Sequence, residues 1–389
     1  MLRLQPGRDR RVKFGHPWAF SNEIVMSAEA RALPPGAAVR LEGDDGVKHG
    51  VWQFNPHSLI AARVLDRDAT ATPDAAWFQA KLQAALNVRE RLGIAQYCRL
   101  VHAEADGLPG LIVDRFDDVI ALQANTVGME AATPLIVEAL RALLNPRSIL
   151  ARNDSAVRAL EGLPQETTLL HGTEARARVE EGGLAFEVDL LSGQKTGWFF
   201  DQRENRARVA SIAAGATVLD AFCHTGGFGL LAADGGASAV TLLDRSQPAL
   251  DLALASAEAN GLAERVTAQR GEALEALERM VAAKTTFDIV VADPPAFAKS
   301  RKDIPAALRA YQRLARLCAQ LVAPGGYLFI ASCSHHAAPV EFAEAVAQGV
   351  WRAKREARLL ASTGAGPDHP VHPMLPESAY LKAQLLQLG

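Results

Sequence analysis

The spacing of apolar and polar residues divides the chain into three stretches. In residues 1–70, short runs of alternating apolar and polar positions are separated by turn residues such as Gly, Pro and Asp, a pattern typical of short strands. Three such runs cover Ala38–Leu41, Gly50–Phe54 and Leu59–Val64. We therefore expect a small β-rich domain in this stretch.

Residues 73–190 combine helical and strand periodicity, which predicts an α+β domain. The predicted elements are, in chain order, a helix with Pro73 in its first turn that runs to Leu92, a hairpin of Leu111–Arg115 and Val119–Gln123, a helix over Pro134–Leu144 and a strand over Leu184–Leu190. No residue pattern in this stretch points to chemistry.

Strands and helices alternate regularly in residues 191–389, which predicts an α/β fold with a parallel sheet and helices on both of its faces. The predicted strands are Thr217–Asp220, Ala239–Leu243, Val266–Gln269, Phe287–Ala292 and Tyr327–Ser332. Ligands of such sheets bind beyond the carboxyl ends of the strands. The residues that follow each strand are therefore the candidates for a binding site.

The composition is that of a globular protein with more than one domain. The chain has 389 residues, of which 49% are hydrophobic and 22% are charged, and a typical domain has ~150 residues. This balance excludes a disordered or fibrous protein. The net charge of −3 provides no overall attraction for a polyanion, so any nucleic-acid site must be a local basic patch.

Cysteine usage and the N-terminal residues favour a reducing cytoplasm. The four cysteines show no zinc-type spacing, and the first residues lack the apolar core of a secretory signal. Pro324, Gly325 and Gly326 interrupt the longest uncharged run, so we expect no membrane segment.

A basic patch does occur near the start of the chain. Arg8, Arg10, Arg11 and Lys13 lie close together in sequence and are followed by Phe14. Cations beside an aromatic residue suit contact with phosphates and stacking on bases. An ordinary solvated surface is the alternative, and charge alone leaves both open.

The ends of the first two predicted strands of the α/β stretch favour a nucleoside cofactor. Asp220 ends the first strand, and Asp244-Arg245 ends the second at roughly the 20-residue interval at which an acidic residue binds ribose hydroxyls. A dinucleotide site needs glycine where Asp220 stands, because an acid would repel a diphosphate, and here the glycines come later, at Gly226. The acid suits the cation of S-adenosylmethionine (SAM) better than NAD, and a turn with only a packing role is the alternative.

Two further strand ends carry candidate reactive groups. Asp293-Pro294-Pro295 fixes a carboxylate that can hydrogen-bond the edge of a base, although such a run can also be a simple turn. Ser332-Cys333-Ser334 places a cysteine next to the predicted Asp293 loop, where a thiolate could attack a substrate. Cys318, in contrast, shares the apolar face of a predicted helix. The histidines of Asp368–Pro373 are more typical of loop packing than of a metal site, and we assign no metal ligands.

Together these motifs resemble the ribosomal large subunit methyltransferase I family. The resemblance rests on the run Leu191–Arg206, which contains Gly-Gln-Lys-Thr-Gly and Asp-Gln-Arg, and on the motifs at Asp220, Asp293 and Ser332–Ser334. It extends to Gly15–Phe20, Asp368–Pro370 and Tyr380–Lys382. The family implies a β-barrel-like PUA domain over 1–70, a central α+β domain over 73–190, and a class I methyltransferase domain with a Rossmann-like sheet over 191–389. It also implies SAM-dependent methylation of cytosine C5 in large-subunit (23S) ribosomal RNA.

The family further implies a role for each matching residue. Cys333 would add to cytosine C6 and so make C5 nucleophilic, and Asp293 would hydrogen-bond N3 or the amino group of the base. The base that removes the C5 proton stays open between an ordered water and His335, because Ala296 and Phe297 stand where some such enzymes carry a second cysteine. Residues implied to hold the cofactor, or to close over it and the target base, are Gln194, Phe199, Asp201, Arg203, Asp220, Phe222, Thr225, Gly226, Asp244, Arg245, Glu272 and Asp293.

Other functions remain open at this point. Methylation of a guanine nitrogen would need no thiol, and a non-catalytic RNA-binding protein would need no cofactor. Redox chemistry with a nicotinamide is disfavoured by the late glycines. Cys223 is a rival nucleophile that we expect to be a small loop residue. The implied product is S-adenosylhomocysteine and the implied partner is ribosomal RNA, without a membrane, while the oligomeric state is open, a homodimer being one option.

Overall fold

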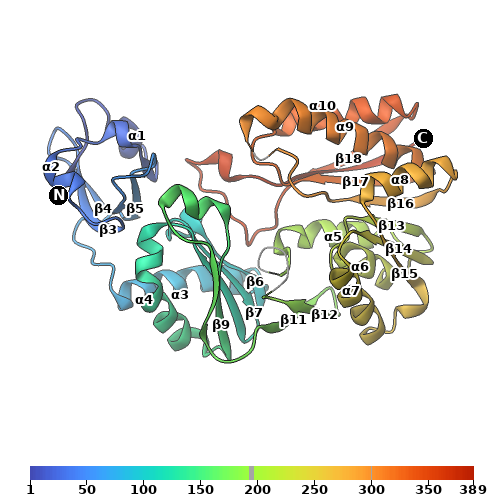
Figure 1. Ribbon diagram of the computed structural model, residues 1–389, viewed down its shortest axis with the longest axis horizontal. Helices are drawn as coiled ribbons and strands as arrows, with labels where there is room; N and C mark the ends of the chain where they lie inside the picture. Colours follow the sequence, from blue (N-terminus) through green and yellow to red (C-terminus); the bar gives the residue numbers. More distant parts are fainter. Residues whose placement is uncertain (192–196, 299) are drawn as a thin grey trace. The chain divides into compact units, whose positions relative to one another are not determined.

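The structure, a computed structural model, describes residues 1–191, 197–298 and 300–389, and its chain divides into two compact units (Figure 1). Unit 1 comprises Met1–Ala177, Asp189–Phe200 and Pro367–Pro376. Unit 2 comprises Arg178–Val188, Asp201–Gly366 and Glu377–Gly389. Each unit is therefore built from segments that are distant in sequence.

The first part of unit 1 is a five-stranded sheet, as the alternating pattern predicts. The strands follow the order β1-β3-β4-β5-β2, and Trp52 and Phe54 fill the core beneath them. Their bounds are β1 Leu2–Arg3, β2 Trp18–Ala19, β3 Ala37–Glu42, β4 Lys48–Phe54 and β5 Ala62–Asp66, with short helices α1 Arg10–Lys13 and α2 Ala28–Arg31. The prediction that a strand starts at Leu59 is wrong, because Leu59 lies in an exposed turn ahead of β5.

A second five-stranded sheet, with the order β10-β9-β8-β7-β6, completes the core of unit 1 together with two helices. The bounds are α3 Ala75–Arg91, β6 Tyr97–His102, β7 Leu111–Phe116, β8 Val119–Ala124, α4 Val127–Leu144, β9 Ser148–Asn153 and β10 Glu166–His171. The predicted hairpin is confirmed as the antiparallel pair β7 and β8. Leu184–Leu190 is confirmed as β12 Leu184–Asp189, which pairs with β11 Arg176–Glu181, and most of both strands belongs to unit 2.

Two predicted helix starts in unit 1 are wrong, and side-chain caps explain both. Pro73 precedes α3 and does not lie in its first turn, because Asp74 caps the helix with a carboxylate that accepts a hydrogen bond from the Trp77 amide. Thr126 caps α4 in the same way, so this helix begins well before Pro134, which lies in its interior. A side-chain acceptor for a free amide of the first turn fixes where a helix begins.

Unit 2 contains a seven-stranded sheet with the order β15-β14-β13-β16-β17-β19-β18. The five predicted strands are all present and parallel, whereas β18 and β19 run antiparallel and were not predicted. The strands are β13 Thr217–Ala221, β14 Ala239–Asp244, β15 Val266–Arg270, β16 Phe287–Ala292, β17 Val322–Ser332, β18 Ala357–Thr363 and β19 Lys382–Leu388.

Helices cover both faces of this sheet, which confirms the expected α/β architecture (Figure 1). The helices α5 Arg203–Ala210, α6 Gly227–Asp234 and α7 Gln247–Ala259 lie on one face, and α8 Ala273–Ala282, α9 Ile304–Leu321 and α10 Pro339–Arg352 lie on the other. Strand residues such as Val218, Leu219 and Val290 are fully buried because both faces are covered. None of the helices in the described ranges has the length and hydropathy of a membrane span.

The topology brings the carboxyl ends of the parallel strands to one edge. β13 lies between β14 and β16, and the chain order reverses there, which is where open α/β sheets bind ligands. β16 pairs in register with β17, so that Ala292 lies opposite Ile330. The residues that follow these two strands, beginning with Asp293 and Cys333, therefore emerge side by side.

Candidate active site

The turn that follows β13 has a backbone conformation that only a few residue types adopt readily. Phe222, His224 and Gly226 have φ values of 62°, 49° and 78°. Left-handed backbone is unfavourable for a side chain as bulky as Phe, and such strain clusters at functional sites. The turn folds back so that the His224 amide donates a 3.0 Å hydrogen bond to Asp244. Thr225 and Gly226 are buried within it.

The Asp220 carboxyl group at the end of β13 is buried and accepts a 2.8 Å hydrogen bond from the Gly229 amide of α6. Burial raises the pKa of this carboxyl to about 7, and the nearby carboxylates of Asp293 and Asp244 act in the same direction. A buried acid under repulsion from two others is stabilised in its ionised form by a cation. This part of the edge is thus suited to a positively charged ligand.

Asp244 at the end of β14 lies next to that turn and organises the backbone around it. One of its carboxylate oxygens accepts from His224, and the other accepts a 2.8 Å hydrogen bond from the Ser246 amide at the start of α7. Arg245 is exposed. Glu272 is an exposed residue at the N-terminus of α8, after β15, so it lies at the same edge of the sheet.

Asp293 is held by a chain of side-chain amides that no sequence pattern assigned. Gln202 donates a 2.9 Å hydrogen bond to the Asp293 carboxylate, and its own oxygen accepts from Asn205 at 2.7 Å. The Asn205 oxygen in turn accepts from the Thr363 hydroxyl at 2.7 Å. Gln202 and Asn205 fall within the motif run Leu191–Arg206, which was the available signal. The chain fixes the carboxylate direction that the two prolines only suggested.

Cys333 lies beside this carboxylate loop. Its sulfur is 4.0 Å from the Pro294 carbonyl oxygen, and its side chain is half-buried. Ser332 and Ser334 on either side are fully buried, and both hydrogen-bond the Tyr311 hydroxyl, at 2.8 and 2.9 Å. The two serines are thereby tied to α9, while the thiol between them stays accessible.

The other three cysteines have the properties of packed residues. Cys98, Cys223 and Cys318 are buried. Burial raises the pKa of the Cys318 thiol to about 12. Burial, together with the negative charges of Asp220 and Asp244, raises the pKa of Cys223 well above its usual value. A thiol with a raised pKa is a poor nucleophile at neutral pH, so the geometry favours Cys333 over Cys223.

Tyr380 connects two more of the candidate residues. Its hydroxyl donates to the buried Asp201 carboxylate, and its ring stacks on the exposed His335 ring at a centroid distance of 5.1 Å. Arg203 forms a 3.8 Å ion pair with Glu181. Phe199 is partly buried and belongs to unit 1, and Gln194 lies outside the described residues.

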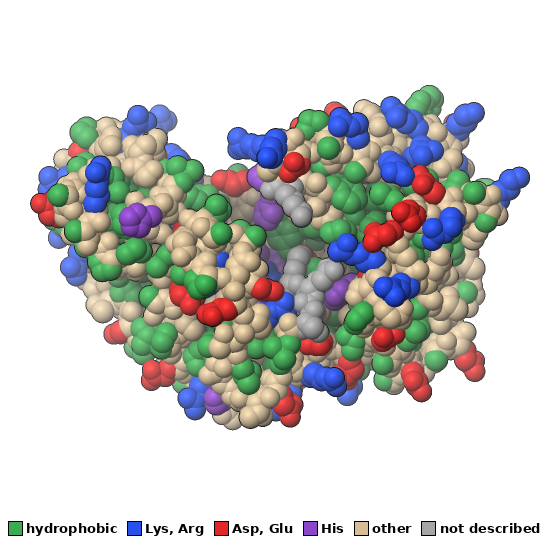
Figure 2. Space-filling model, in the orientation of Figure 1, with side chains coloured by type: hydrophobic (Ala, Val, Ile, Leu, Met, Phe, Trp, Pro, Cys, Tyr) green, Lys and Arg blue, Asp and Glu red, His purple; other side chains and the backbone are tan. Residues whose placement is uncertain are grey.

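The basic patch of unit 1 is partly engaged in internal ion pairs. Arg11 contacts Glu23 and hydrogen-bonds His16, while Lys13 contacts Asp9 at 2.5 Å and Asp45 at 2.8 Å. Arg8 and Arg10 are exposed and form no ion pair with any residue that the structure describes. In Figure 2 cationic and anionic side chains are interspersed on the visible face, in keeping with the small net charge.

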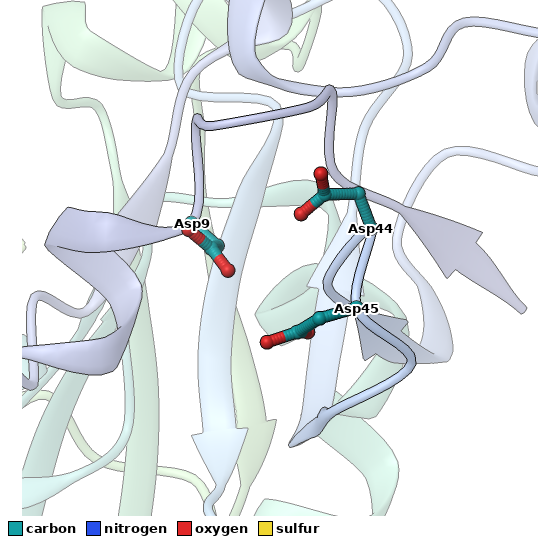
Figure 3. Close-up of side chains that lie close together, drawn as sticks. All are labelled: Asp9, Asp44 and Asp45. Atoms are coloured by element: carbon teal, nitrogen blue, oxygen red, sulfur yellow. The ribbon is translucent and has the colours of Figure 1, made fainter.

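The partners of Lys13 belong to a group of three carboxylates. Asp9, Asp44 and Asp45 each place an oxygen within 4.8 Å of the others (Figure 3). The Lys13 ammonium already offers a counter-charge to two of them, and Asp44 and Asp45 are exposed to water. The charge of the group is therefore partly offset from within the protein, by one ammonium against three carboxylates.

The Asp368–Pro373 segment serves packing, as expected from its sequence. The Asp368 carboxylate accepts hydrogen bonds from the Arg99 amide, at 3.0 Å, and from His369, at 2.9 Å. The Asp368 carbonyl accepts from Arg89. Asp368 and His369 are both buried. These contacts tie residues 367–376 into unit 1.

Comparison with known proteins identifies two family models in the chain. Residues 123–386 match the model of S-adenosylmethionine-dependent methyltransferases, and residues 2–67 match that of a PUA-like domain. The first match covers more than half of the chain. The Rossmann-like sheet of unit 2 and the β-rich start of unit 1 are thus those of a SAM-dependent methyltransferase with an N-terminal PUA-like domain.

Curated proteins and solved structures match the chain over nearly its whole length. It is 38% identical to ribosomal RNA large subunit methyltransferase I of Aeromonas hydrophila subsp. hydrophila, over 99% of this chain and 98% of that protein. It is 36% identical to the protein of the same name from Photobacterium profundum, over 97% of each. A SAM-dependent methyltransferase structure from Streptococcus mutans covers 99% of both chains with a TM-score of 0.81 and 21% identity. A methyltransferase complexed with S-adenosylhomocysteine covers 100% of both with a TM-score of 0.83 and 21% identity, and these two structures show a shared fold.

Proposed function

Because the chain belongs to the ribosomal RNA large subunit methyltransferase I family of SAM-dependent enzymes, we propose that it methylates cytosine C5 in large-subunit (23S) ribosomal RNA through a covalent adduct of Cys333. The observation that carries the proposal is the position of one accessible thiol beside Asp293, with the other three cysteines buried. Methylation of a guanine nitrogen would require the carboxylate loop but no thiol. We assign the reaction to the cytoplasm, where ribosomal RNA is assembled.

The residues around β13 and β14 fit the cofactor. The buried Asp220 carboxyl would face the cationic methionine part, together with Phe222, Thr225 and Gly226 of the left-handed turn. Asp244 and Arg245 would hold the ribose, and Glu272 the adenine side. Asp201 and Arg203 would border the cofactor and the target base, with Phe199 and Gln194 as further candidates. Bound SAM would supply the methyl group.

The side chains of the Cys333 loop account for the activation of the base. The Cys333 thiolate forms a bond to cytosine C6, and the electron pair of the C5–C6 double bond moves so that C5 becomes nucleophilic. Asp293 donates to N3 when it is protonated, or accepts from the amino group when it is ionised, and donation to N3 offsets the negative charge that develops on the ring. After C5 has taken a methyl group, a base, either an ordered water or His335, accepts the C5 proton, and the electron pair of that C–H bond restores the C5–C6 double bond and expels the thiolate.

The PUA-like domain, residues 1–70, is assigned to RNA binding through its basic patch. All four cations of this patch are exposed, and Arg8 and Arg10 are the two without an ion pair among the described residues; Arg10 lies over the exposed ring of Phe14. An arginine beside an exposed aromatic ring offers both phosphate contact and base stacking. Arg11 and Lys13 would contribute only after leaving their internal partners.

Covalent trapping tests the proposed function. Ribosomal RNA that contains 5-fluorocytosine should form a stable adduct with the protein and SAM, because fluorine at C5 cannot leave as a proton does. Tryptic mass spectrometry should locate the adduct on the peptide with Cys333. The Cys223→Ala variant serves as a control and should trap equally well. Turnover without an adduct, or methyl transfer to guanine, would contradict the proposal.

A further inference from the structure

We propose that Lys382 is a positioning residue for Cys333, which holds the Ser332–Ser334 loop and favours the thiolate through its positive charge. The inference rests on the proposed function, since that function assigns the nucleophile to Cys333. It begins from the fold, because β19 lies against β17 and its first residue, Lys382, pairs with Ser332 in register. The lysine is therefore placed across from the strand end that leads into the cysteine.

The hydrogen bonds of Lys382 tie the loop to β19. Its ammonium donates to the Ser334 carbonyl at 2.5 Å and to the Tyr380 carbonyl at 3.1 Å. Tyr311 on α9 also hydrogen-bonds the two serine hydroxyls. The loop is therefore held by hydrogen bonds to both α9 and β19. The backbone on both sides of Cys333 is thus fixed, which keeps its thiol directed at the Pro294 side of the site.

The ammonium is in an unusual position for a lysine. Lys382 is only 7% exposed, and it forms no ion pair with a carboxylate in the part of the chain that the structure describes. Two carbonyl oxygens accept from this ammonium, and a nearby anion would stabilise its charge further. Burial lowers the pKa of Lys382, and the charge of a Cys333 thiolate acts in the opposite direction. The two groups therefore interact, and the interaction favours both charged forms.

Other charged or titratable groups approach Cys333 from the neighbouring elements. Asp293, on the loop after β16, disfavours a thiolate when it is ionised, and Tyr311 on α9 is neutral because burial raises its pKa. His335 follows in the same loop and stacks on Tyr380. Lys382 is the buried cation among these groups. The charge of Lys382 would offset the repulsion between an ionised Asp293 and the Cys333 thiolate, and Lys382 itself would keep its proton. The thiol proton goes to solvent before the Cys333 sulfur bonds to C6.

Alkylation of Cys333 tests this without any methyl transfer. The full-length protein is treated with iodoacetamide over pH 5 to 10 and the Cys333 peptide is quantified by mass spectrometry, with the buried Cys98, Cys223 and Cys318 as internal controls. Lys382→Gln keeps a donor but removes the charge, and it should raise the midpoint of the profile by about one pH unit, or slow alkylation about tenfold below it. Lys382→Arg should stay close to wild type, as should Lys284→Met, which removes an exposed lysine elsewhere.

An unchanged midpoint in a Lys382→Gln protein that still binds SAM would overturn the proposal. A second measurement applies even if that variant fails to fold, because the interaction between two sites is reciprocal. The pH profile for competitive acetylation of Lys382 with acetic anhydride should have a lower midpoint in Cys333→Ser than in the wild type, because the variant lacks the thiolate that favours the ammonium form of Lys382. Equal midpoints would likewise overturn the proposal.

The test of Lys382 and the test of the proposed function can fail independently of each other. Alkylation reports on the thiol alone, so a coupled Lys382 and Cys333 pair would stand even if RNA carrying 5-fluorocytosine formed no adduct. Conversely, a trapped adduct together with an unshifted alkylation profile would retain the nucleophile and remove the role of Lys382.

Discussion

Two loops at the same edge of the unit 2 sheet each carry a cysteine, and they differ in the charge around it. Cys223 is buried, and its thiolate is disfavoured first by this burial and then by the negative charges of Asp220 and Asp244. Cys333 lies between two hydroxyl-bonded serines, and the carbonyl of Ser334 accepts from the Lys382 ammonium. The difference teaches that the electrostatics of each loop, more than the presence of sulfur, decides its chemistry. One loop is suited to a cationic cofactor and the other to an anionic nucleophile.

The sharpest way to break this comparison is to remove each sulfur in turn. Cys333→Ala should lower turnover by roughly 10³-fold or more, because cytosine C5 is then never activated. Cys223→Ala should keep turnover within a few-fold of wild type. Methylation of ribosomal RNA with labelled SAM measures both, and calorimetry with SAM should show that each variant still binds it. A fully active Cys333→Ala protein would reverse the assignment of the two loops.

Asp293 should have the next largest effect, since it belongs to the Cys333 side of the edge. Asp293→Asn should lower kcat by about 10²- to 10³-fold, because the charge that develops on the ring loses its stabilisation. The KM for RNA should change little. Gln202→Leu, which removes the amide donor to Asp293, provides a milder variant in which about a tenfold loss is expected. A raised KM with normal kcat would instead indicate a role in RNA binding.

The Asp220 side of the sheet edge, where we propose that the cofactor binds, should make the affinity for SAM depend on pH. Asp220 has a pKa raised to about 7, so below that pH its carboxyl is neutral and attracts a cation poorly. SAM affinity should therefore increase as the pH rises through about 7, with proton release on binding, and isothermal titration in buffers of different ionisation enthalpy measures both. In Asp220→Asn the pH dependence should vanish, and affinity at pH 8 should fall by roughly tenfold. An unchanged profile would place Asp220 away from the cofactor charge.

The same shift predicts a stability difference of defined sign. The folded-state pKa of Asp220 lies above the usual value of 3.8, so the protonated carboxyl stabilises the fold at low pH, and this contribution is lost as the pH rises from about 4 through about 7. Without ligand, Asp220→Asn should consequently be more stable than wild type at pH 8, by on the order of 2 kcal/mol. Urea denaturation at pH 5 and pH 8 checks this, because the advantage should shrink at the lower pH.

The smallest effect is expected outside unit 2, in the basic patch. Arg8→Ala together with Arg10→Ala should lower RNA affinity several-fold and make its salt dependence shallower by about one unit per lost phosphate contact. Arg11→Ala with Lys13→Ala is the matched pair, whose effect should be weaker because these cations have internal partners. Filter binding over a series of salt concentrations distinguishes the pairs. If RNA affinity depended on salt concentration with the same slope in the wild type and in both variants, the basic patch would have no role in RNA binding.

Much of the fold of unit 2 could be predicted from the sequence. Strands buried on both faces give continuous apolar runs, and β13, β14, β16 and β17 follow from such runs. The edge strand β15 is largely exposed, and it was predicted from the regular alternation of strands and helices. The predicted neighbourhood of Asp293 and Cys333 needed only the rule that parallel strands end at one edge. The strands β18 and β19 escaped prediction, because β18 is largely exposed and its register shifts at Leu359, which interrupts the alternation.

The residues that support the site were harder to predict than those that form it. Lys382 faces Ser332 through a long-range antiparallel register, and no local spacing records such a pairing. Tyr311 lies on the apolar face of α9, so its pattern indicated only a core residue. Gln202 and Asn205 belong to a motif run, but their partners are separated from them by a large part of the chain. Side-chain chemistry at strand ends is visible in a sequence, whereas contacts across a sheet are not.

The amide chain that ends on Asp293 also has a polarity. An Asn or Gln amide can turn by half a rotation and exchange its donor and acceptor ends at little cost. Here a carboxylate oxygen of Asp293 accepts from Gln202, so the Gln202 oxygen is left to accept from Asn205, and the Asn205 oxygen accepts from the Thr363 hydroxyl. The Asn205 nitrogen also donates to the Gly364 carbonyl at 3.3 Å, and because a carbonyl only accepts, it fixes the same orientation. The two acceptors would therefore keep both amides oriented in Thr363→Val, and that substitution would remove only the hydroxyl that satisfies the Asn205 oxygen.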